Sequence, residues 1–387
     1  MADFLVSAAE MRERGGGKWR RYPPDVLPAF VADVDFNVAP AVQAALQRFV
    51  DREDYGYGLA DDLDALYAAF AHWMERRHGW KPEPILTVAL ADVVQGIVAV
   101  QVAYSSPGDG VIVQTPSYPP FLRTVAGSGR RLVENRMLDG GRRFEIDFDG
   151  LEEAAREARV LLFCNPHNPT GRVFERHELQ RVVEVARRHD LVIASDEIHA
   201  DVVFPPHKHI PMETIPGAAE RTVTLTSATK SFNIPGARAA VAHFGTPQLK
   251  ERFESVLPDH LLGRPSRFGL AATVAAWTES EGWLHEVLAY LAGNRETVER
   301  WVEARPGIGH HSPEATFLAW LDCRELGLPG SPYKFFLESA RVALSDGAEF
   351  GAPGAGCVRL NFGTSAEILD EILGRMSRAL EAIRDGR

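Results

Sequence analysis

The sequence has few cysteines, and those it has stand far apart. Cys164, Cys323 and Cys357 form no Cys-x-x-Cys pair. This spacing indicates buried thiols in a reducing compartment. We therefore expect a cytoplasmic protein.

The sequence also lacks a long hydrophobic run and an excess of positive charge. No run reaches membrane-spanning length, and Met1 to Glu10 shows no basic segment followed by a long apolar core. The formal net charge is -11 at pH 7, which argues against nucleic acid and membranes as partners because neither tolerates a broadly negative surface. Any phosphate site must therefore be a local feature.

The sequence has the composition of a globular protein, and its length exceeds what a single hydrophobic core usually reaches. Hydrophobic residues make up 45% and charged residues 25% of its 387 residues. Between residues 86 and 238, short apolar runs alternate with helical patterns, which is typical of an α/β fold with a parallel sheet covered by helices. The apolar runs are 111–114, 160–164, 191–195 and 222–225, and the helical patterns include 95–104, 151–158 and 175–189.

The chain divides into three segments. Residues 1–40 are rich in glycine and proline, and we expect an extended, irregular arm that contributes to the smaller domain. Residues 41–282 are predicted to form the large domain. Residues 283–387 begin with a long amphipathic helix and then mix strand and helix patterns, which predicts a small α+β domain.

One lysine stands between hydroxyl side chains just after the apolar run 222–225. Lys230 follows Ser227 and Thr229, and an amine that attacks a carbonyl needs partial burial or a nearby positive charge to lose its proton. The two hydroxyls and Arg238 would suit a phosphate. Ser-x-x-Lys also fits a serine acyl-enzyme pattern, but the Ser-Asp-Asn and Lys-Thr-Gly partners are missing. A solvated lysine in a turn is the other interpretation.

Polar residues also follow two other predicted strands, at the ends where open α/β sheets bind ligands. Asp196 comes after the apolar run 191–194, and a buried carboxylate there needs a cation such as a pyridinium nitrogen, unless it caps the next turn. Asn168 lies in the rigid turn 165–171. Its amide could donate a hydrogen bond to a ligand, although Asn-Pro also marks ordinary turns.

Further candidates lie elsewhere along the chain. Tyr118 could lie against a flat heterocycle or pack on the surface. Val93 and Val94 begin a helical pattern whose amides could hold a phosphate, or which needs no ligand. Arg359 alternates with apolar residues and suits either a carboxylate ligand or a structural salt bridge. Tyr57, on a loop loosened by glycine, could reach outward from a subunit or be a surface residue.

Taken in order, these motifs resemble one enzyme superfamily. They are Asn-Pro-His-Asn-Pro-Thr-Gly at 165–171, Asp-Glu-Ile-His-Ala-Asp at 196–201, Ser-Ala-Thr-Lys at 227–230 with Arg eight positions later, and Val-Arg-Leu-Asn-Phe at 358–362. The chain resembles the fold-type I pyridoxal-phosphate enzymes of the class I/II aminotransferase superfamily. Segments 31–36 and 113–121, with His199 where aminotransferases usually have tyrosine, are similar to the cystathionine β-lyase-like branch of C–S lyases.

The resemblance implies pyridoxal 5'-phosphate as the cofactor and a mostly parallel sheet of the seven-stranded type. It implies that Lys230 forms the covalent imine with the cofactor and that Asp196 pairs with the pyridine nitrogen. Asn168 would bind the cofactor phenolate oxygen, and Tyr118 would stack on the ring, with His199 also at the cofactor. Arg359, together with Asn168, would hold the substrate carboxylate.

The resemblance also implies a homodimer with shared active sites. Tyr57 would reach in from the second subunit and join the catalytic machinery. The phosphate would be held by the hydroxyls of Ser227 and Thr229, the guanidinium of Arg238, and the backbone around Val93 and Val94.

Two positions depart from the lyase branch. That branch commonly has Pro-Gly-Val-Val-Pro before the phosphate-binding helix, whereas this chain has Ala-Asp-Val-Val-Gln at 91–95. A carboxylate at Asp92 beside a phosphate is unfavourable, so it must point away or meet a cation. Arg238 is the residue of aminotransferases and is not general among the lyases.

The resemblance favours a β-elimination on cystathionine or another S-substituted L-cysteine that yields thiol, pyruvate and ammonia. Transamination of an amino acid uses the same residues, and a requirement for an amino-group acceptor would distinguish it. A different pyridoxal-phosphate reaction on an S-conjugated cysteine in a specialised pathway is a third interpretation. A non-catalytic effector-binding protein is the fourth, although the retained lysine, aspartate, asparagine and arginine argue against it. No metal site is predicted: His207, His209 and Asp201 could lie close together, but a solvated loop after a strand is the favoured interpretation.

Overall fold

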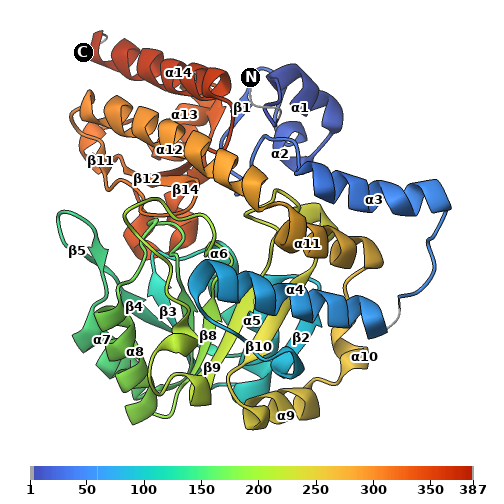
Figure 1. Ribbon diagram of the computed structural model, residues 1–387. Helices are drawn as coiled ribbons and strands as arrows, with labels where there is room; N and C mark the ends of the chain where they lie inside the picture. Colours follow the sequence, from blue (N-terminus) through green and yellow to red (C-terminus); the bar gives the residue numbers. More distant parts are fainter. Residues whose placement is uncertain (1–3, 59, 386–387) are drawn as a thin grey trace.

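A seven-stranded sheet forms the centre of the molecule (Figure 1). The computed structural model describes residues 4–58 and 60–385, so the predicted segment ends at 1 and 387 lie outside the described residues. Within the sheet, β10 alone runs antiparallel to its neighbours, which confirms the predicted, mostly parallel architecture. In spatial order the strands are β2 (Thr87–Leu90), β10 (Ala240–Phe244), β9 (Thr222–Thr226), β8 (Val192–Asp196), β7 (Ala158–Cys164), β3 (Gly110–Thr115) and β4 (Arg131–Arg136).

Helices cover both faces of this sheet (Figure 1). Val111 and Val113 of β3 point to the face covered by α5 (Val93–Tyr104), α6 (Pro119–Gly127) and α9 (Pro247–Val256). Ile112, between them, points to the opposite face under α7 (Phe148–Ala155) and α8 (Arg176–Arg188), because successive side chains of a strand alternate between faces. Strands buried on both faces are apolar throughout, which is why the sequence predicted several of them.

Three more helices pack at the β2 and β10 edge of the sheet. They are α3 (Pro40–Arg52), α4 (Ala60–His78) and α11 (Arg267–Glu279). Ala89 and Val241 from the two strands share a core with Phe70 and Trp277 of these helices. The helix α4 ends where expected, because Gly79 adopts a left-handed φ of 68°.

The C-terminal part of the chain forms a second, antiparallel sheet. Its order is β11 (Gly309–His310), β12 (Leu318–Asp322), β15 (Cys357–Asn361) and β14 (Ser345–Asp346). Three helices accompany it, α12 (Glu281–Glu303), α13 (Pro332–Ser339) and α14 (Ala366–Asp385). Phe36 of the N-terminal arm is buried in the same core as Leu360 and Ile372.

The N-terminal arm is more regular than we expected, and the prediction of an extended, irregular segment is wrong for its first half. It contains α1 (Ala8–Arg14) and α2 (Gly17–Arg20). Ser7 and Glu10 form a reciprocal capping box at the start of α1, a signal that the nearby glycines obscured. The arm then pairs β1 (Leu27–Pro28) in parallel with β13 (Val342–Ala343). The chain also contains a short hairpin, β5 (Leu138–Asp139) with β6 (Phe144–Glu145), and the helix α10 (Asp259–Leu262). Among the described residues, no helix is long and apolar enough to span a membrane.

Candidate active site

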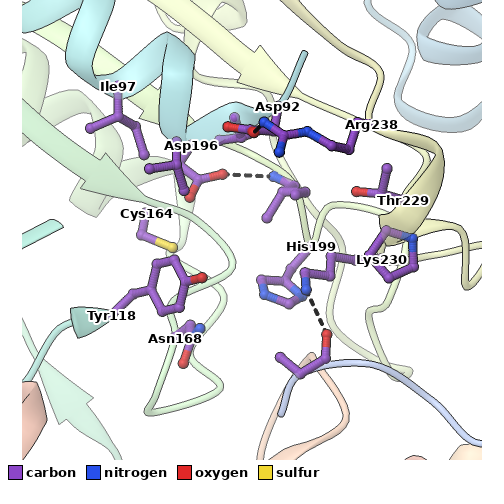
Figure 2. A pocket seen from close by; sticks show the side chains of 15 residues that line it. Asp92, Ile97, Tyr118, Cys164, Asn168, Asp196, His199, Thr229, Lys230 and Arg238 are labelled. Atoms are coloured by element: carbon purple, nitrogen blue, oxygen red, sulfur yellow. Dashed lines mark hydrogen bonds and ion pairs between the residues drawn. The ribbon is translucent and has the colours of Figure 1, made fainter. Parts of the chain in front are cut away.

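The carboxyl ends of β7, β8 and β9 lie side by side at one edge of the large sheet, close to the start of α5. In register, Cys164 pairs with Asp196, and Asp196 pairs with Leu225. A cavity of about 160 Å³ lies here (Figure 2). Its lining residues are Ala32, Asp92, Val93, Val94, Ile97, Tyr118, Cys164, Asn168, Asp196, Ile198, His199, Thr229, Lys230, Pro235 and Arg238. The structure thus brings most of the predicted site residues together.

Lys230 lies in the turn after β9 and extends its side chain into the cavity (Figure 2). Its Nζ donates a hydrogen bond to the carbonyl oxygen of Ala32 at 2.5 Å. Burial lowers the pKa of the amine to about 8, and the positive charge of Arg359 acts in the same direction, while the carboxylate of Asp33 opposes both. A lysine with this pKa is partly uncharged near neutral pH, as a nucleophile or base requires.

Asp196 ends β8 with its side chain in the same cavity. It is buried, and its Oδ1 accepts a hydrogen bond from the amide of Ile198 at 3.1 Å. Burial raises the pKa of this carboxyl group to about 7, and the charge of Glu197 adds to the effect. A buried carboxylate in this position favours a cationic partner, because a cation would compensate for the lost hydration.

Arg359 lies on β15 and reaches the same site from the second sheet. Its Nη1 donates to Oδ1 of Asn168 at 2.8 Å, and its Nη2 donates to the carbonyl of Phe30 at 2.9 Å. The guanidinium is buried, and among the described residues its Nε has no acceptor. Burial lowers its pKa to about 10. A buried guanidinium with a spare donor is suited to a carboxylate ligand.

Two ring side chains lie on opposite sides of the cavity. Figure 2 shows Tyr118 on the side of Asn168 and Cys164, and His199 on the side of Lys230. Burial raises the pKa of Tyr118 and lowers the pKa of His199 to about 3. Both side chains are therefore uncharged at neutral pH. The Nδ1 of His199 is buried without a hydrogen-bond partner among the described residues.

The far end of the cavity combines a helix start with a hydroxyl and a cation. Val93 and Val94 are the first two residues of α5, and Thr229 and Arg238 line the cavity with them. Asp92 is also there, and its carboxylate is paired with Arg238 at 2.5 Å. We expected Asp92 either to point away or to meet a cation, and the structure confirms the second alternative, with Arg238 as the cation.

Three predicted residues, Arg359, Ser227 and Tyr57, lie outside the cavity lining. Arg359 reaches the cavity through its hydrogen bond to Asn168, which is one of the lining residues. The hydroxyl of Ser227 donates to the carbonyl of Ala239 at 2.6 Å, and its oxygen lies 3.0 Å from Oγ1 of Thr229, so in this chain it orients the turn that carries Lys230. Tyr57 is fully exposed, and its role at the active site of a second subunit stays a prediction.

Several lining residues were not predicted from the sequence. Ile198 lies in the turn after β8, two residues beyond Asp196, where the alternation of a strand no longer indicates which side chains share a side. The carbonyl of Ala32 carries no side-chain signal. Among the described residues, no group of three or more histidine, cysteine, aspartate or glutamate side chains could hold a metal ion.

Comparison with known proteins adds independent findings. Residues 31–376 match the family model of aminotransferase class I and II. The chain is 34% identical to the cystathionine beta-lyase PatB of Bacillus subtilis (strain 168), covering 92% of this chain and 93% of that protein. It is also 34% identical to the cystathionine beta-lyase of Corynebacterium glutamicum, covering 96% and 98%. The crystal structure of cystalysin from Treponema denticola, which contains pyridoxal 5'-phosphate, superposes with a TM-score of 0.92 at 29% identity, covering 99% and 100%.

Proposed function

The chain belongs to the aminotransferase class I and II family, and we propose that within this family it is a pyridoxal-phosphate-dependent C–S β-lyase. Its substrate would be cystathionine or another S-substituted L-cysteine, and its products thiol, pyruvate and ammonia. The cavity that joins Lys230, Asp196 and the Asn168–Arg359 pair carries the proposal. Two relatives at 34% identity over more than nine-tenths of the chain are named cystathionine beta-lyase, which favours the lyase over the aminotransferase.

The residues of the cavity fit pyridoxal 5'-phosphate. Lys230 is an amine of lowered pKa, and Asp196 is a buried carboxylate without a cationic hydrogen-bond partner among the described residues. The amides of Val93 and Val94, with Thr229 and Arg238, offer donors for a phosphate. When bound, the cofactor supplies an aldehyde that condenses with amines and a ring that accepts electrons from the substrate α-carbon.

Lys230 provides the base of the reaction. Its Nζ takes the proton from the substrate α-carbon, and the lowered pKa of about 8 leaves a useful fraction of the amine uncharged at neutral pH. The carbonyl of Ala32, which accepts from Nζ at 2.5 Å, holds the amine on the arm side of the cavity. The thiolate then leaves from the β-carbon, and water hydrolyses the remaining unsaturated amino acid to pyruvate and ammonia.

The charges of Asp196 and Arg359 would bind the cofactor ring and the substrate carboxylate, respectively. The carboxylate of Asp196 would face the cationic ring nitrogen of the cofactor, which would lower the carboxyl pKa from its raised value of about 7. Arg359, together with Asn168, would bind the substrate carboxylate through donors that the protein leaves available. Binding at this point fixes which bond of the α-carbon faces Lys230.

The active unit is proposed to be a cytoplasmic homodimer. Tyr57 is fully exposed, and Tyr55 on the same loop is 62% exposed. Such exposed aromatic side chains are suited to contact a second copy of the chain. The three cysteines are free and buried, which supports a reducing compartment.

The proposal is tested by incubating the purified protein with L-cystathionine, and separately with an S-alkyl cysteine, without any keto acid. We expect pyruvate and free thiol in equal amounts, and loss of both in Lys230→Ala. The matched control is Lys81→Ala, because Lys81 is exposed and remote from the cavity lining. Absence of pyruvate and thiol, with amino-group transfer appearing only after a keto acid is added, would instead establish an aminotransferase.

A further inference from the structure

The carboxylate of Asp92 has a special position at the start of α5. Its Oδ1 accepts a hydrogen bond from the amide of Gln95 at 2.7 Å, so Asp92 is the N-cap of the helix. Its Oδ2 accepts from Nη2 of Arg238 at 2.5 Å. Asp92 and Arg238 both line the cavity that contains Lys230 (Figure 2). One side chain thus occupies two of the donors that an incoming phosphate would use.

Other backbone amides at the start of α5 remain available as hydrogen-bond donors. The amide of Ala91 donates a hydrogen bond to Oε1 of Gln95 at 2.8 Å. This side-chain contact back to the residue before the N-cap resembles a capping box. The amides of Val93 and Val94 have no acceptor among the described residues, as expected for the first residues of a helix. Two backbone amides at the start of α5 therefore remain available to an anionic ligand, although the carboxylate of Asp92 already lies beside them.

The backbone of Arg238 is held in place by the fold and does not depend on the contact with Asp92. It has a left-handed φ of 52°, which is unfavourable for a residue with a side chain. The preceding turn packs tightly on α11, because a Cβ on Gly269 would lie 2.4 Å from the carbonyl oxygen of Ala237. The backbone position from which the Arg238 side chain starts is thus fixed, and either Asp92 or a phosphate at the start of α5 can take the guanidinium as its partner.

We propose that Asp92 competes with the phosphate group of the cofactor for Arg238 and for the start of α5, and so weakens the binding of the phosphorylated cofactor. The inference rests on the proposed pyridoxal-phosphate function. Asp92 and Arg238 are 37% and 64% exposed in their side chains, so water screens their interaction and the pair can open. A phosphate that shares Arg238 with a carboxylate experiences like-charge repulsion that a neutral side chain at position 92 would remove.

The test compares Asp92→Asn with the wild type. Asparagine caps a helix as well as aspartate does, so this substitution removes the charge and keeps the acceptor for the amide of Gln95. Apoprotein is titrated with pyridoxal 5'-phosphate and separately with pyridoxal, and binding is followed by tryptophan fluorescence and cofactor absorbance. For the variant we expect the Kd of the phosphorylated form to fall by about tenfold, the size of a partly screened charge repulsion at short range. The Kd of pyridoxal should change by less than about twofold, because pyridoxal carries no phosphate.

The matched control is Asp147→Asn. Asp147 is the N-cap of α7 and accepts from the amide of Gly150 at 3.0 Å, and it does not line the cavity. This control should leave both dissociation constants unchanged. An unchanged or higher Kd of Asp92→Asn for pyridoxal 5'-phosphate, in a variant that melts like the wild type, would overturn the inference alone. Failure of the wild type to bind either compound would overturn the proposed function together with the inference.

Discussion

The two ends of the active-site cavity obtain their charges in different ways. At one end, Asp196 is buried in the lining and Arg359 is buried behind Asn168, and burial moves the pKa of each, as it also does for Lys230. At the other end, Asp92 and Arg238 are partly exposed and form an ion pair. At the first end, burial shifts the pKa values toward those that a reactive amine and carboxyl group need. At the second end, water screens the ion pair, so a single substitution can change how strongly that end binds an anion. We call them the reaction end (Lys230, Asp196 and Arg359) and the phosphate end (Asp92, Val93, Val94 and Arg238).

The largest expected effect is at the reaction end. Lys230→Ala should lower the rate of pyruvate formation by about a thousandfold or more, because it removes both the nucleophile and the base. The assay follows pyruvate from L-cystathionine in cofactor-saturated protein. A residual rate within about tenfold of the wild type would show that another group takes the α-proton, since a general base contributes a hundredfold or more.

Arg359→Lys keeps the positive charge but removes the two-pronged donor. We expect kcat/KM for an S-alkyl cysteine to fall by about a hundredfold, mainly through KM, because a paired carboxylate loses one of two charge-assisted hydrogen bonds. The matched substrate is the corresponding amine without a carboxylate, whose slow turnover should not change. An equal loss for both compounds would indicate a structural role in holding Phe30 and Ser345.

Tyr57 tests whether a second subunit completes the cavity. Tyr57→Ala should lower activity by at least about tenfold if the side chain joins the active site of its neighbour. Mixing this variant with Lys230→Ala and reassociating the subunits should then restore about a quarter of wild-type activity, because half of the dimers would carry one intact site. Mixtures that remain inactive would argue that each cavity is built from one chain.

The smallest effect concerns the pKa of Lys230. Its lowered pKa of about 8 predicts that Lys230 in the apoprotein reacts with an amine-directed reagent half-maximally near pH 8, with the rate falling as pH drops because the amine becomes protonated. Asp33 raises this pKa, so Asp33→Asn should shift the midpoint to lower pH. Mass spectrometry of the Lys230 peptide, with exposed Lys81 as internal reference, reads the midpoint. A midpoint near that of Lys81 would contradict the burial of the amine.

The reaction end could be predicted from the sequence more fully than the phosphate end. Asp196, Asn168 and Lys230 each follow an apolar strand, and parallel strands bring such positions to one edge of a sheet. The need of Asp92 for a cation was also predictable, but its identity was not, because Arg238 lies 146 residues further along the chain. The contact depends on the left-handed backbone of Arg238 and its packing against α11, and neither leaves a pattern in the sequence.

Parts of the fold could also not be predicted from the sequence. No strand was predicted at β10, the one antiparallel strand of the described sheet, whose pairing with β2 joins residues more than a hundred positions apart. The helix α1 was missed because it is short and a glycine-rich segment follows it directly from Gly15. Ala32 enters the site through a carbonyl oxygen, which every residue possesses, so only the path of the arm could reveal it.

The partition of L-cystathionine between elimination and transamination tests the central claim most directly. The measurement counts, by mass spectrometry, the pyruvate and homocysteine released and the sulfur-containing keto acid that transamination would produce from the same substrate. We predict that pyruvate and homocysteine appear in equal amounts without an amino acceptor and greatly exceed the keto acid. A product mixture dominated by the sulfur-containing keto acid, formed only when an acceptor is present, would contradict the account.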